Sequence, residues 1–150
     1  MKNALRLIIT TVNNNQPVLI RLIVGFIFLS EGIQKFLFPE LTGTGRFEKI
    51  GFNDPAFWAY FTAVFEIGSG IFILPGLLTR LAAFPLLVIM ITAFITTKLP
   101  ILHEKGFWQF AHDYRTDFAM TILLLYLIIY GSGKLSLDSS ITGREVHLLQ

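Results

Sequence analysis

The chain has 150 residues, of which 53% are hydrophobic and only 15% are charged, and its formal net charge is +2. Soluble domains average about 25% charged residues, so this chain lacks the charge to cover a water-facing surface. The composition excludes a disordered protein and argues against a soluble nucleic-acid binder, which needs clustered lysine and arginine. Cysteine is absent, which excludes disulfides and cysteine-ligated clusters within the chain.

Residues 1–16 are weakly basic, and their apolar part, residues 5–12, is too short to cross a membrane. No small-residue cleavage motif of a signal peptide follows this part cleanly. We therefore expect an interfacial lead-in, with the next helix acting as an uncleaved signal anchor.

Four apolar stretches follow, and each is close to the roughly 20 residues that a membrane-spanning helix needs. They predict helices over residues 17–38, 56–77, 79–99 and 114–131. A chain this small could not bury four such helices in a soluble core, because a small domain keeps a large surface. The predicted fold class is all-α, as an integral membrane bundle of four antiparallel transmembrane helices.

The connections between these helices alternate in length. Residues 39–55 and 100–116 are predicted as long polar loops on one face of the membrane, whereas the tight turn 75–80 lies with both termini on the other face. The 12 lysines and arginines divide equally between the two faces, while most acidic residues lie on the long-loop side. We therefore expect a multi-pass protein of the plasma membrane with cytoplasmic termini.

The first helix carries charges on one face, since Arg21, Gly25, Gly32 and Lys35 form a single stripe. Its two glycines permit close contact with another helix, which places the stripe inside the bundle. Glu31 precedes Lys35 by one turn, so an intrahelical ion pair that eases membrane insertion is one interpretation. A ligand-binding role for these charges is the other.

Glu66 lies near the middle of the second helix, on a face of small and polar residues. An ionised carboxylate at that depth must be paired or protonated. In one interpretation Glu66 is neutral and makes a structural hydrogen bond between helices. In the other it forms a proton or ligand site, and in that case Glu66 is our candidate catalytic residue. We predict that it joins a polar network with at least one of Lys35, Arg21 and Arg115.

The last helix opens with Arg115 and Asp117, and an aromatic segment containing Trp108 precedes it. Arg115 is expected to reach a carboxylate or to cap the bundle at the interface, and Asp117 is either an N-cap or part of the site. Trp108 belongs either to an aromatic belt at the headgroups or to a lid over a pocket. No histidine lies within a predicted helix and no metal-ligand spacing occurs, so we expect no haem, iron–sulfur cluster or metal.

Four segments together resemble the DoxX family: RLIVGFIFLSEGIQK at 21–35, EIGSG at 66–70, LPGLLTRLAA at 74–83 and GSGKLSLD at 131–138. The resemblance spans almost the whole chain and implies a small four-helix membrane protein. It also implies that Arg21, Lys35, Glu66 and Arg80 occupy recurrent polar positions of the family. Some members are described as subunits of quinone-linked oxidoreductase assemblies.

Together these observations favour a membrane accessory subunit of a redox system, at most a subunit of a quinone-linked enzyme. It would bind a hydrophobic carrier such as a quinone in a polar pocket of the bundle. The alternative is a non-catalytic scaffold or lipid-binding protein whose buried charges fix helix registry. Expected partners are membrane lipids, a redox protein and a second copy, with no nucleic acid. The candidate ligand-binding residues are Arg21, Glu31, Lys35, Arg115, Asp117 and Trp108.

Overall fold

The computed structural model describes residue 11 and residues 14–147, with side chains described as far as residue 142. Most of the predicted interfacial lead-in therefore lies outside the described residues. The elements are α2 (Pro17–Leu37), α3 (Thr44–Ile50), α4 (Pro55–Ile73), α5 (Thr79–Ala93), the π-helix η1 (Phe94–Lys98), α6 (Leu99–Tyr130) and α7 (Leu137–His147). No strand occurs among these residues, which confirms the all-α class.

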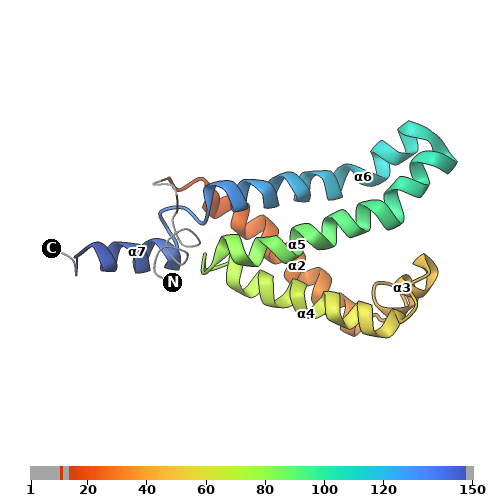
Figure 1. The fold of residues 1–150 in the computed structure, drawn as a ribbon, viewed down its shortest axis with the longest axis horizontal. Coiled ribbons are helices and arrows are strands. Elements are labelled where there is room, and N and C mark those ends of the chain that lie inside the picture. The colour runs from red at the N-terminus through yellow and green to blue at the C-terminus, as the bar shows by residue number, and fades with distance from the viewer. Residues whose placement is uncertain (1–10, 12–13, 148–150) are drawn as a thin grey trace.

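The helices pack as two pairs, α2 with α4 and α5 with α6, and α4 and α5 join the pairs. The described residues nearest the chain termini, at the start of α2 and in α7, lie with the turn after α4 at one end of the molecule, while α3 and the tip of the α5–α6 hairpin lie at the other (Figure 1). The segment between α2 and α4 and the turn after α4 thus lie at opposite ends of the molecule, as the sequence predicts. We call these the termini end and the α3 end.

The predicted polar loop over residues 100–116 is wrong, because this segment is helical. The chain continues from α5 through η1 into α6 and reverses at Gly106, whose φ of 80° and ψ of 176° are not helical. Glycine adopts a positive φ readily because it has no Cβ. Hydropathy detects where a helix becomes polar and not where it ends, so the hairpin extends beyond the predicted spans.

Three helical segments are long and apolar enough to cross a membrane: Pro17–Leu37, Pro55–Ile73 and the continuous stretch Thr79–Tyr130, which contains the reversal at Gly106. Large apolar side chains such as Phe26, Phe84 and Ile129 are exposed on the outside of the bundle. A contiguous apolar exterior is typical of a protein surrounded by lipid. The chain is therefore a helical membrane protein.

Glycines bring α2 and α4 into close contact, as the sequence predicts. A Cβ added at Gly32 would lie 2.8 Å from the carbonyl oxygen of Ala63, and one added at Gly70 would lie 2.9 Å from that of Gly25. Small residues at helix interfaces let backbones approach and pack in a membrane. This close packing turns the polar face of α4 toward α2.

Candidate functional site

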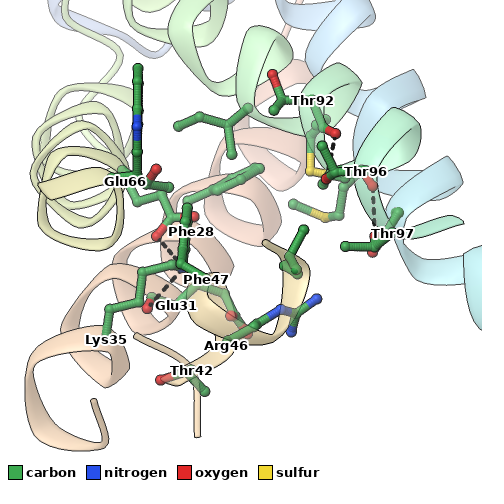
Figure 2. Close-up of a pocket in the computed structure, with 18 of the residues that line it drawn as sticks. Phe28, Glu31, Lys35, Thr42, Arg46, Phe47, Glu66, Thr92, Thr96 and Thr97 are labelled. Carbon is green, nitrogen blue, oxygen red and sulfur yellow. Dashed lines mark hydrogen bonds and ion pairs between the residues drawn. The ribbon is translucent and has the colours of Figure 1, made fainter. Parts of the chain in front are cut away.

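A cavity of about 600 Å³ lies between the two helix pairs, toward the α3 end. Side chains from α2, α3 and α4 line one side, and side chains from α5, η1 and α6 line the other. Figure 2 shows Lys35, Glu31 and Glu66 across this space from Thr92, Thr96 and Thr97. The volume falls within the range of about 300–1,000 Å³ typical of small-molecule sites.

A buried ion pair forms part of the cavity wall. The Nζ atom of Lys35 lies 2.6 Å from Oε2 of Glu66, and the two side chains are only 9% and 5% exposed. The small residues that flank Glu66 on α4 and the glycine stripe of α2 bring these two faces together. The predicted pairing of Glu66 with a cation is thus confirmed, with Lys35 as the partner.

The intrahelical pair between Glu31 and Lys35 is not formed by their side chains. Lys35 Nζ instead donates to the backbone carbonyl of Glu31, at 3.5 Å. Its short contact with Glu66 prevails because an ammonium in a buried site gains most from a carboxylate that is also excluded from water. The side chain of Glu31 remains exposed and contributes to the cavity lining.

A second ion pair lines the cavity from the other helix pair. Lys98 Nζ lies 3.2 Å from Oδ2 of Asp117 and also donates to the carbonyl oxygen of Asp113, at 2.9 Å. Asp117 lies within α6, so its interpretation as the N-cap of the last helix is wrong. Lys98 is not among the site residues predicted from the sequence, although the threonines that precede it indicate a polar face.

Those threonines line the cavity, with Thr92 one turn before the adjacent pair Thr96 and Thr97. Thr92, Thr96 and Thr97 each donate a hydroxyl hydrogen bond to the carbonyl four residues earlier, at 2.9, 2.8 and 2.6 Å. Each hydroxyl oxygen keeps lone pairs that can accept a hydrogen bond from a ligand. The last two threonines lie in the π-turn η1, a rare local widening of the helix that occurs frequently at functional sites.

Aromatic rings form the wall of the cavity at the α3 end. Phe47 and Phe52 make a tilted contact with ring centroids 5.2 Å apart, and Phe52 and Trp58 make another at 6.0 Å. Trp58 contacts Phe61 edge to face, at 5.8 Å. Arg46 of α3 also lines the cavity. Neither Trp58 nor Arg46 is among the predicted site residues, because nothing in the sequence places α3 over the space between the helix pairs.

Three of the predicted ligand-binding residues lie outside the cavity lining. Arg21 is buried at the termini end, where its Nη2 donates to the carbonyl of Leu135 at 2.6 Å. Arg115 is exposed and contacts His112 at 2.9 Å. Trp108 is 84% exposed beyond the cavity, which is incompatible with a lid in this structure. The corrected site therefore contains Glu66, Lys35, Glu31 and Asp117 from the prediction, together with Lys98, Arg46 and Trp58.

Arg21 has a structural position instead. The polar tail after α6 folds back against the turn that follows α4, and Asp138 accepts hydrogen bonds from the backbone N–H groups of Leu78 and Thr79, at 2.8 and 3.3 Å. The Arg21 bond to Leu135 holds the same tail. Of the two basic residues on the α2 stripe, Arg21 therefore holds the tail at the termini end, whereas Lys35 lies on the cavity wall.

The described residues contain no group of three or more histidine, cysteine or acidic side chains arranged to hold a metal ion. The polar chemistry on these cavity walls consists of ammonium, guanidinium, carboxylate and hydroxyl groups beside aromatic rings. Such a set can donate and accept hydrogen bonds and can exchange protons with a bound molecule.

Comparison with known proteins finds one matching family and three similar proteins. The DoxX family profile matches residues 17–99. An uncharacterized membrane protein of Mycobacterium tuberculosis is 47% identical over 131 residues, covering 83% of this chain and 80% of that protein. A Bacillus subtilis protein named as a candidate oxidoreductase, CatD, is 33% identical over 123 residues, covering 80% and 82%. An uncharacterized protein of Haemophilus influenzae is 32% identical over 124 residues, covering 80% and 86%. No solved structure matches significantly.

Proposed function

Because this chain belongs to the DoxX family, we propose that it is a membrane accessory subunit of a redox system and binds a quinone-like carrier in its cavity. The observation that carries this proposal is the buried Lys35–Glu66 pair on the wall of a cavity of about 600 Å³. A quinone needs an apolar slot for its ring and tail and hydrogen-bond donors for its oxygens. The oxidoreductase name of a relative supports the redox context.

In this proposal the side chains have separate tasks. Lys35 donates a hydrogen bond to a ring oxygen, and Glu66 holds or accepts a proton beside it. The aromatic wall of Phe47, Phe52, Trp58 and Phe61 lies against the ring or its tail. The threonine hydroxyls supply acceptors for the reduced, hydroxyl-bearing form.

The topology belongs to the same proposal. We place four transmembrane passes across the plasma membrane, counting the two arms of the α5–α6 hairpin separately, with both termini in the cytoplasm. A redox protein that meets the α3 end, the surrounding lipids and a second copy are the proposed partners.

The two tryptophans provide a direct binding assay. In a Trp108→Phe variant, Trp58 in the cavity wall is the remaining fluorophore. We expect a short-chain naphthoquinone to quench it saturably in detergent or nanodiscs. The matched control is Trp58→Phe, which keeps only the exposed Trp108 and should show no saturable component. Equal, non-saturable quenching of both variants would contradict the proposal.

Substitutions at Glu66 separate this proposal from a scaffold or lipid-binding protein. In the proposed site, Glu66→Gln keeps a hydrogen bond and the fold but weakens quinone binding or abolishes the function of the assembly. Glu66→Leu removes the polar group altogether. Unchanged quinone binding in well-folded forms of both variants would remove Glu66 from the site and favour the scaffold.

A further inference from the structure

Two lysines, Lys35 and Lys98, line the cavity and have the same kinds of hydrogen-bond partners. Each lysine lies at the end of a helical segment, Lys35 in the last turn of α2 and Lys98 at the last residue of η1. Each pairs with a carboxylate of a neighbouring helix, Glu66 of α4 or Asp117 of α6. Each also donates to a backbone carbonyl, that of Glu31 or Asp113. The two groups belong to different helix pairs.

The ammonium group of each lysine has one N–H donor that these contacts do not use. An ammonium carries three N–H donors, and the structure provides two acceptors for each lysine among the described residues, one carboxylate and one carbonyl. Both lysines line the cavity. The third donor of each is therefore available to a molecule that enters the space between the helix pairs.

Part of the cavity lining is suited to a flat apolar molecule. Phe28 of α2 and the thioethers of Met90 and Met120 line the cavity from three different helices. Flexible, polarizable thioethers make favourable contacts with aromatic rings. Each helix pair therefore contributes both a lysine–carboxylate group and apolar side chains to the cavity lining.

We propose that the cavity recognises its ligand from both helix pairs, with Lys35 donating a hydrogen bond to one ring oxygen and Lys98 donating one to a second oxygen on the opposite edge of the ring. This inference rests on the proposed function and deepens it: the ligand class is a ring that carries two opposed carbonyls, and a ring with a single carbonyl is a poorer ligand. Lys98 and Asp117 become specificity-determining residues. The ligand also bridges the helix pair α2–α4 and the hairpin α5–α6.

The test compares two flat tricyclic compounds that differ only in one ring carbonyl, 9,10-anthraquinone with two opposed carbonyls and anthrone with one. Binding of both is measured by calorimetry in nanodiscs, for the wild type, Lys98→Met and Lys105→Met. Lys105 is a matched control, because it is an exposed lysine of the same hairpin and does not line the cavity. A second variant, Lys98→Gln, removes the charge but keeps a polar side chain.

We expect the wild type and Lys105→Met to bind the dione at least about tenfold more tightly than the monoketone, as one charge-assisted hydrogen bond predicts. Lys98→Met and Lys98→Gln should lose this preference through weaker dione binding, with monoketone binding within about twofold of the wild type. A wild type that binds both compounds equally would overturn the inference without any variant, as would a preference that survives in folded Lys98 variants. Failure of the wild type to bind either compound would instead contradict the proposed function itself.

Discussion

Replacing Lys35 by methionine would test whether the buried ion pair holds α2 against α4. The substitution leaves the carboxylate of Glu66, 5% exposed, without its cation. Removing one partner of a buried pair costs about 3–5 kcal/mol of unfolding free energy. In a chain of this size about 1 kcal/mol corresponds to roughly 2–4 °C in the unfolding midpoint, so the loss should be roughly 6–20 °C.

The double variant Lys35→Met/Glu66→Leu should recover most of this loss. Neither charge is then buried, and replacing a buried pair by apolar side chains of similar volume is often neutral. Thermal unfolding in one detergent, followed by intrinsic fluorescence, gives the four midpoints of the double-mutant cycle. Lys49→Met is the control, because Lys49 is exposed in the last turn of α3, and it should leave the midpoint nearly unchanged.

Two outcomes of this cycle would refute the reasoning. If the double variant is destabilised by the sum of the single effects, the two side chains are not energetically coupled. If Lys35→Met alone unfolds no earlier than Lys49→Met, the ion pair contributes nothing to the contact between α2 and α4.

Three further predictions concern the helix arrangement. Because the chain has no cysteine, an impermeant maleimide should label a cysteine placed at Glu48 and one placed at Leu78 from opposite sides of the membrane; labelling from the same side would contradict the proposed topology. Gly32→Ala should lower the free energy of unfolding by about 1–3 kcal/mol, because the added Cβ would lie 2.8 Å from a carbonyl oxygen of α4. Gly68→Ala should leave it unchanged, because the space around Gly68 is open. Equal melting temperatures of the two variants would argue against tight packing of α2 on α4. Asp138→Ala removes both hydrogen bonds that cap α5 and should cost about 1 kcal/mol in thermal unfolding; an unchanged midpoint would show that the tail does not stabilise the turn.

Local sequence pattern was sufficient to predict the class of the protein and to identify several of its buried residues. Apolar stretches of spanning length indicate a membrane protein because the bilayer imposes a minimum helix length. The spacing of Gly25, Gly32 and Lys35 identified the inner face of α2, since helical periodicity is a property of the sequence alone. A carboxylate in the middle of an apolar helix identified Glu66 as buried and paired, because its charge has no other favourable environment there.

Which cation Glu66 meets was decided by the tertiary structure. Arg21 and Lys35 share one face of α2, but at 1.5 Å per residue they lie about 21 Å apart along the helix. The depth at which α4 packs against α2 selects Lys35 and leaves Arg21 to the tail at the termini end. Periodicity specifies a face and contains no information on the axial offset between two helices.

The second half of the site depended entirely on the path of the chain after α5. Polar residues between 100 and 116 indicated a loop, yet they continue the helix, and one glycine at position 106 reverses it. Only that reversal brings Lys98 and Asp117 together, and only the packing of the hairpin against α2 and α4 places their ion pair on the same cavity as Lys35 and Glu66. A contact between residues so placed depends on where the chain turns and how two helix pairs dock, and neither is determined by local sequence pattern.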